Sequence, residues 1–181
     1  MMLKRAAQLA AVILIGAGQL ALAQDKGKDQ AEIDATAKDV IDDFLAMDGA
    51  KTLYDKAAGY AVFKVTKAGL GASGAGGTGV AVNKSTGART YMRMGSAGVG
   101  FTFGVSRYDI VILFETADKL AAFAKGGWDS SATAQAAAGT EGAQVSSTFF
   151  DGVAYYQIGR RGLMASADVS GTRFWMADEL N

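Results

Sequence analysis

The feature that most constrains the fold is a change of hydrophobic period near residue 58. Before it, the apolar residues of 31–47 recur at helical spacing and form one stripe, with acidic and lysine side chains on the remainder of the turn. After it, apolar residues alternate with small or polar ones, as in strands that lie on a core. The chain contains no proline. The pattern therefore predicts helices followed by a sheet.

The predicted elements follow from these periods. We expect helices over residues 31–47, 50–57 and 117–125, and strands over residues 60–65, 79–83, 89–94, 99–106, 109–114, 152–158, 163–169 and 172–176. Residues 110–114 are apolar at every position, which places that strand centrally in the sheet. The predicted fold class is α+β, with N-terminal amphipathic helices packed on a curved, mostly antiparallel β-sheet or sandwich and one inserted helix.

The N-terminal residues have the composition of an export signal. A positive start at Lys4 and Arg5 precedes an uncharged, mainly apolar run over residues 6–22, and Ala21-Leu22-Ala23 has the form of a cleavage site. We predict a signal peptide over residues 1–23 and a single domain over residues 24–181. The run ends without cysteine, which excludes lipoprotein anchoring at this site. We expect an exported, periplasmic protein, with peripheral attachment to a membrane as an option.

Missing residue types exclude several kinds of chemistry. The chain has no histidine and no cysteine, so it cannot build a Ser-His or Cys-His dyad, a disulfide or a cysteine-rich zinc site. No set of carboxylates has calcium-loop spacing. We predict that the protein is not an enzyme, has no catalytic residues, and needs neither a cofactor nor a metal.

Charge is unevenly distributed along the chain, although 18 basic residues balance 18 acidic ones. Residues 24–57 carry five lysines and nine acids, whereas residues 58–108 carry no acid and twelve of the 24 glycines. The basic residues of the acid-free segment are Lys64, Lys67, Lys84, Arg89, Arg93 and Arg107. The overall neutrality argues against nucleic acid as a partner. A local basic segment can nevertheless meet a phosphate-bearing surface.

Glycine-rich strings raise the question of a nucleotide site. Residues 69–74 and 74–79 both satisfy G-x-G-x-x-G, but Val80-Ala81-Val82 follows as a strand, and a dinucleotide site needs a helix there. We therefore expect these glycines to permit close approach of backbones.

Two strand faces have a pattern of their own. In residues 98–105 one face is bulky and the other nearly bare. We expect a helix, such as that over residues 31–47, to pack on the bare face; the alternative is a ligand groove. Arg89, Tyr91 and Arg93 share a face that is either an ordinary solvated surface or a functional basic one.

The order of these motifs resembles the SYLF domain family. The resemblance covers about residue 31 to the C-terminus and is carried by motifs at residues 58–63, 69–79, 95–104, 109–114, 155–156 and 159–164, together with Trp128. Lys64 stands where many members have proline, and the SH3 or FYVE modules of eukaryotic members are absent. The resemblance implies lipid binding, and in some yeast members actin binding; actin is not an expected partner in a bacterial envelope.

The resemblance and the charge pattern together predict a lipid-binding protein. We expect anionic phospholipid headgroups or a membrane surface to be bound by Lys64, Lys67, Lys84, Arg89, Arg93 and Arg107 on a basic, glycine-rich β surface, with exposed aromatic residues near the glycine loops contacting acyl chains. Arg160 and Arg161 form a candidate second basic site. The alternative is a structural or protein-interaction module of the bacterial envelope with no lipid role.

Overall fold

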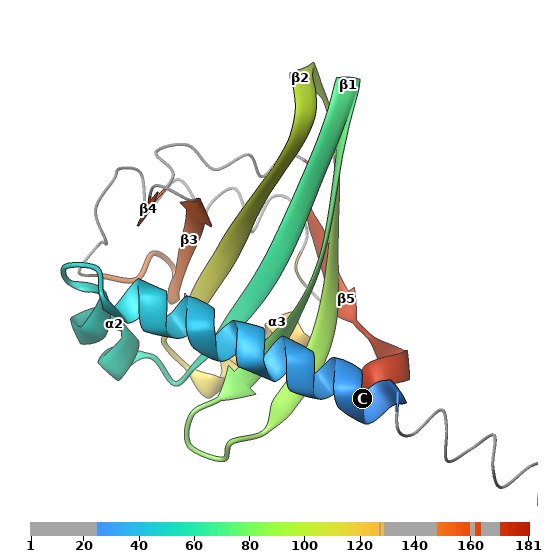
Figure 1. Cartoon of the computed structure of the whole chain (residues 1–181). Coiled ribbons are helices and arrows are strands. Elements are labelled where there is room, and N and C mark those ends of the chain that lie inside the picture. Colours follow the sequence, from blue (N-terminus) through green and yellow to red (C-terminus); the bar gives the residue numbers. More distant parts are fainter. Residues whose placement is uncertain (1–24, 127, 129–147, 160–161, 164–170) are drawn as a thin grey trace, which may run out of the picture.

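A computed structural model describes residues 25–126, 128, 148–159, 162–163 and 171–181 (Figure 1). Within these ranges, the backbone alone is described for residues 70–72, 98–103 and 162–163. The predicted signal peptide, the Arg160–Arg161 pair and most of the strand predicted over residues 163–169 lie outside the described residues.

The order of helices and strands in the structure largely follows the order that the hydrophobic periods predict. A helix covers residues 25–45 and is followed by α2 (Ala50–Lys56), β1 (Gly59–Asn83), β2 (Arg89–Phe114), α3 (Ala117–Ala124), β3 (Val153–Gly159), β4 (Gly162–Leu163), β5 (Arg173–Met176) and the short 3-10 helix η1 (Asp178–Leu180). The strands form one antiparallel sheet in the order β1-β2-β3-β4, with β5 paired to β2. The α+β class with helices packed on a curved antiparallel sheet is confirmed.

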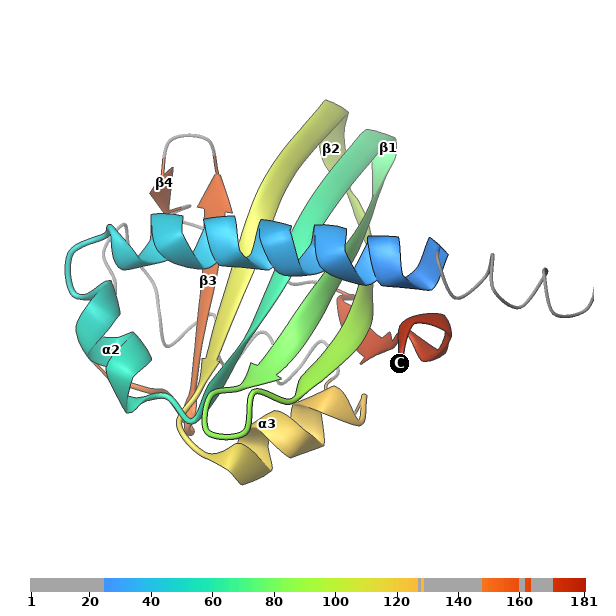
Figure 2. The same cartoon turned by 60° about the horizontal axis from the view of Figure 1, so that its bottom comes forward.

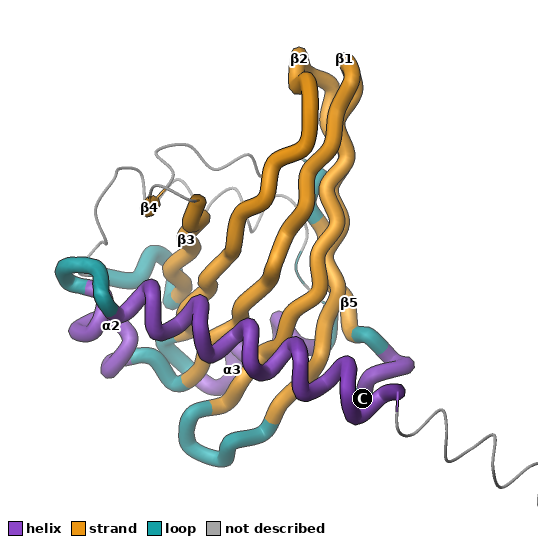
Figure 3. The backbone as a smooth tube through the Cα atoms, in the orientation of Figure 1, coloured by secondary structure: helices purple, strands orange, loops and turns teal. Residues whose placement is uncertain are grey.

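The sheet is dominated by a long ribbon made of β1 and β2. The two strands pair from Gly59 with Phe114 to Val82 with Arg89, with one irregularity between Leu70 and Ala72. Figure 3 shows that both strands run to a tip and return, so each contributes two limbs to the sheet. The outgoing limb of β2 pairs with β5, and its returning limb pairs with β3.

The continuity of β1 and β2 differs from the sequence prediction of five separate short strands. The residues that were expected to interrupt them, 66–78 and 95–98, are also strand. Glycine makes this possible where the limbs of β1 meet: a Cβ atom on Gly79 would lie 2.0 Å from the carbonyl oxygen of Val62, and one on Gly77 would lie 2.6 Å from that of Lys64. Both G-x-G-x-x-G strings lie inside β1, so no helix follows either of them, and in the second string Gly77 and Gly79 permit the close backbone approach that was expected.

Helices cover both faces of the sheet (Figure 2), and hydrophobic residues pack beneath them on each face. On one face, Phe44 of the helix over residues 25–45 and Leu53 of α2 pack on residues that include Val62, Val111 and Tyr156. On the other, Leu120 and Phe123 of α3 pack with Phe174 on a cluster that includes Phe63, Ile110, Ile112 and Phe114. Residues 110–114 therefore alternate between two cores, as their uniformly apolar sequence predicts.

The first helix is longer at its N-terminal end than predicted and lies across the limbs of the sheet (Figure 2). It packs on the face that carries Val62, Val80 and Tyr91. The bare face predicted for residues 98–105 falls mainly on residues whose side chains are not described. In the figures the β1–β2 ribbon extends well beyond the helix.

Candidate functional site

A hollow lies where the helix over residues 25–45 crosses the β1–β2 ribbon. Its deeper part, which we name the inner pocket, has a volume of about 250 Å³ and is lined by Asp29, Glu32, Ile33, Thr36, Ala37, Val62, Lys64, Thr78, Gly79, Arg93, Glu179 and Leu180. Its shallower part, the outer basin, has a volume of about 450 Å³ and is lined by Lys64, Thr66, Gly76, Gly77, Thr78, Arg93, Met94 and Trp175. The two parts share Lys64, Thr78 and Arg93, so they lie side by side.

The basin gathers three of the six predicted lipid-binding residues. Lys64 and Arg93 line it, and Arg107 is the register partner of Thr66, which also lines it. Directly paired residues of an antiparallel sheet point to the same face, so Arg107 lies beside the basin. Lys64, Arg93 and Arg107 are all exposed. Together they form a basic rim on a floor of glycine and threonine.

One carboxylate shares this face with the basic rim. Asp109 pairs with Lys64 across β1 and β2 and is half-buried. Burial raises the pKa of Asp109, and the neighbouring Lys64 ammonium opposes that rise. In its ionised form this carboxylate offsets part of the positive charge that Lys64 offers to a ligand.

Arg93 lines both the inner pocket and the outer basin. Its guanidinium binds the Glu179 carboxylate of η1, with Nη2 2.5 Å and Nε 2.6 Å from Oε1. A backbone hydrogen bond at Glu179, followed by the Arg93 guanidinium, holds the pKa of this carboxyl below its ordinary value. Both side chains are about half exposed. An anionic ligand can therefore replace Glu179 as the partner of Arg93 at a small cost in free energy.

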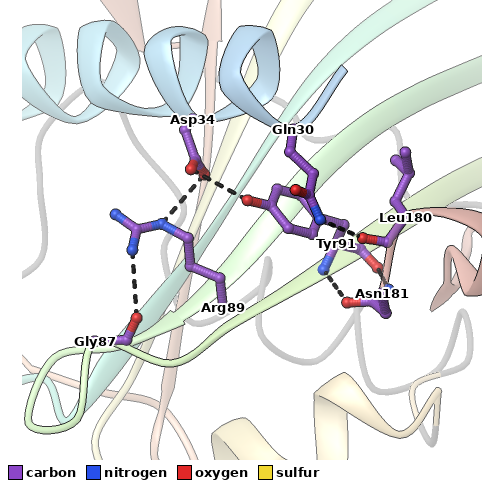
Figure 4. A network of polar contacts seen from close by, with 7 residues as sticks. All are labelled: Gln30, Asp34, Gly87, Arg89, Tyr91, Leu180 and Asn181. Carbon is purple, nitrogen blue, oxygen red and sulfur yellow. Dashed lines mark hydrogen bonds and ion pairs between the residues drawn. The ribbon is translucent and has the colours of Figure 1, made fainter. Parts of the chain in front are cut away.

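Arg89 has a structural role beside the site (Figure 4). Its Nε lies 3.2 Å from Asp34 Oδ1 on the helix, and Tyr91 donates a hydrogen bond of 3.1 Å to Oδ2 of the same carboxylate. Asn181 accepts from the Tyr91 amide and donates to its carbonyl, while Gln30 donates to the Leu180 carbonyl. This network ties the helix, β2 and the C-terminal residues together next to Leu180, which lines the inner pocket.

The remaining predicted residues lie away from the hollow. Lys84 donates to the carbonyls of Tyr54 and Ala57 at the end of α2, and its ammonium sits 4.2 Å from the centre of the Tyr54 ring. Burial lowers the pKa of Lys84. Lys67 alternates to the opposite face from Thr66 and is engaged within the chain. Neither contributes to the basic rim.

Trp175 is the functional candidate that the sequence did not single out. It lies on β5, pairs with Arg93 and is 44% exposed. Its ring lies against Gly95, where an added Cβ atom would be 3.1 Å away. The sequence predicted an aromatic residue near the glycines without identifying it, because the pairing of β5 with β2 brings it there from 80 residues along the chain.

Among the described residues, no group of three or more acidic side chains is placed to hold a metal ion. In that same portion of the chain, no helix has both the length and the apolar character needed to cross a membrane.

Comparison with known proteins gives two similarities. Residues 95–181 match a family model described as Ysc84, a Las17-binding protein actin regulator. The chain is also 41% identical over 137 residues to Beta cell expansion factor A of Aeromonas veronii, an alignment that covers 76% of this chain and 52% of that protein. The chain therefore spans about half the length of the curated relative it matches.

Proposed function

Because the chain belongs to the SYLF (Ysc84) family, as the order of its motifs predicted, we propose that it is a non-catalytic module that binds anionic phospholipid headgroups at a membrane surface through the outer basin and its basic rim. The observation that carries the proposal is the gathering of Lys64, Arg93 and Arg107 around a basin with an exposed tryptophan at its edge.

The basin has two features that favour binding to a membrane surface, namely exposed cations and an exposed aromatic ring. Its exposed cations are attracted to anionic headgroups, and each contributes about 1 kcal/mol near a membrane. Trp175 offers an amphipathic ring of the kind that prefers the boundary between headgroups and acyl chains. Gly76 has no side chain and that of Thr78 is small, which lets a headgroup approach the backbone of β1.

Sedimentation with vesicles tests the proposal. Vesicles of phosphatidylcholine alone are compared with vesicles that also contain phosphatidylglycerol, at low and high salt. We expect binding that needs the anionic lipid and weakens with salt. Absence of binding, or equal binding to both vesicles at both salt concentrations, would overturn the proposed function.

Variants locate the binding surface. Lys64→Gln is expected to weaken binding about fivefold, and Lys64→Gln combined with Arg107→Gln about 25-fold, at about 1 kcal/mol for each charge. The matched control is Lys51→Gln, which removes one exposed positive charge from α2, where no residue lines the hollow. Equal losses in the control and in the Lys64 variant would show that net charge, and not this site, governs binding.

A further inference from the structure

The inner pocket has a different charge from the outer basin. The helix contributes Asp29 and Glu32 to its wall, and β1 contributes Lys64. Glu179 is already paired with Arg93. Within the described residues, Asp29, Glu32 and Lys64 take part in no ion pair. Asp29, Glu32 and Lys64 are all exposed. Apart from the Arg93–Glu179 pair, the side chains that line the pocket therefore carry two negative charges and one positive charge.

This balance does not suit a ligand that is only anionic. A phosphate placed near Lys64 inside the pocket also faces the carboxylates of Asp29 and Glu32, which repel it. A ligand that carries a positive group a few atoms from its phosphate meets attraction at both ends. The arrangement of charges thus selects a zwitterion over a simple anion.

We propose that the inner pocket binds a phosphoethanolamine group, with its phosphate toward Lys64 and its primary ammonium toward Asp29 and Glu32. The inference rests on the proposed function, since it names the headgroup that enters the deeper part of the same site. The group can belong to a membrane lipid or to a free molecule, because the recognising chemistry is the same.

The lining favours a primary ammonium over a quaternary one. No aromatic side chain occurs among the described residues that line the inner pocket, whereas quaternary ammonium groups are recognised by aromatic faces. A primary ammonium carries hydrogen-bond donors that the Asp29 and Glu32 carboxylates and the Thr36 hydroxyl can accept. The chemistry therefore separates ethanolamine from choline.

The size and opening of the pocket agree with this ligand. About 250 Å³ is below the range of pockets that take drug-sized molecules, so it suits a headgroup and not an acyl chain. The pocket adjoins the outer basin, with which it shares Lys64, Thr78 and Arg93. A headgroup that enters from the basin leaves the rest of the lipid outside, next to Trp175.

The test compares ethanolamine with choline at constant anionic charge. Vesicles contain a fixed fraction of phosphatidylglycerol, and the remainder is either phosphatidylcholine or phosphatidylethanolamine. A second arm titrates the full chain with soluble glycerophosphoethanolamine or glycerophosphocholine. We expect a preference for ethanolamine of at least about threefold, as for one partly exposed ion pair. The arm in which it appears identifies a lipid or a free molecule as the source.

A double variant assigns the preference to the pocket. Asp29→Asn with Glu32→Gln should abolish the preference for ethanolamine while binding to phosphatidylglycerol with phosphatidylcholine is maintained or increased. Asp39→Asn, on an exposed position of the same helix, is the control and should retain the preference. A preference that survives the double variant, or no preference in either arm, overturns the inference. Binding to the vesicles with phosphatidylcholine reports separately on the proposed function.

Discussion

The close approach of the two limbs of β1 gives a prediction about stability. Gly79→Ala would place a Cβ atom 2.0 Å from the Val62 carbonyl oxygen and 2.6 Å from Cδ1 of Phe63. Ordinary contacts of a Cβ atom begin at 3.4 Å, so the limbs would have to separate locally by about 1.4 Å. The obstacles are a backbone oxygen and the ring of fully buried Phe63, which cannot rotate away freely.

The expected cost lies at the upper end of the range for overpacking. Inserting a methyl group into a well-packed core costs about 1 to 3 kcal/mol, and here we expect about 3 kcal/mol because backbone must move. With a urea dependence of about 2 kcal/mol per molar, the midpoint of unfolding would fall by about 1.5 M. Urea titration followed by the fluorescence of Trp128 and Trp175 measures this shift.

A neighbouring glycine supplies the control. A Cβ atom on Gly76 meets nothing within 4 Å, so Gly76→Ala should leave stability unchanged or raise it by up to about 1 kcal/mol through the unfolded state. The reasoning fails if both variants unfold within about 0.3 M urea of the wild-type chain. A loss of stability in Gly76→Ala equal to that in Gly79→Ala would contradict it as well.

Three further predictions concern single side chains. Asp34→Ala should destabilise the chain by about 2 to 3 kcal/mol, because Tyr91 loses a charged acceptor, whereas Asp34→Asn should cost about 1 kcal/mol. Urea titration measures both free energies of unfolding, and equal costs would contradict the role of the charge. Burial raises the pKa of Tyr54 from 10.0 to about 12. The stability of the wild-type chain relative to Tyr54→Phe should therefore be constant below pH 10 and fall as the pH rises to about 12. Unfolding midpoints in a pH series measure this difference, and a constant difference would contradict the prediction. Asp109→Asn should strengthen binding to anionic vesicles about fivefold because it removes the carboxylate opposite Lys64; sedimentation measures this, and unchanged affinity would contradict it.

The local parts of the fold were predictable because their signals are local. The helix over residues 117–125 was expected from three apolar positions and a glycine stop, and α3 ends at Ala124 with Gly126 at a φ of +80°. The strand with both faces apolar was found in the centre for the same reason. The continuity of β1 was not predictable, because the glycines that resemble a loop in the sequence are those that let its two limbs meet.

The site was only partly predictable, because the partners of its basic residues come from distant segments. The acid-free segment looks uniformly basic along the sequence. In the structure, Asp34 of the first helix meets Arg89, and Glu179 meets Arg93 across 86 residues of sequence. Lys84 is used to hold the end of α2. No period or motif in the segment itself reveals these contacts.

The salt dependence of vesicle binding distinguishes the two descriptions of this surface. If all six predicted cations acted, about 6 kcal/mol of electrostatic attraction would be screened at high salt, a loss of affinity of about 10⁴-fold. The structure leaves Lys64, Arg93 and Arg107 at the hollow, which limits the loss to about 10²-fold, and the Glu179 partner of Arg93 and the neighbouring Asp109 reduce it further. Partition coefficients measured on phosphatidylglycerol vesicles from low salt, where charges act over about 30 Å, to about 1 M salt, where they act over about 3 Å, give this loss directly. A loss near 10⁴-fold would refute the three-residue rim, because it would require Arg89 and Lys84 to leave their partners in the chain and face the membrane.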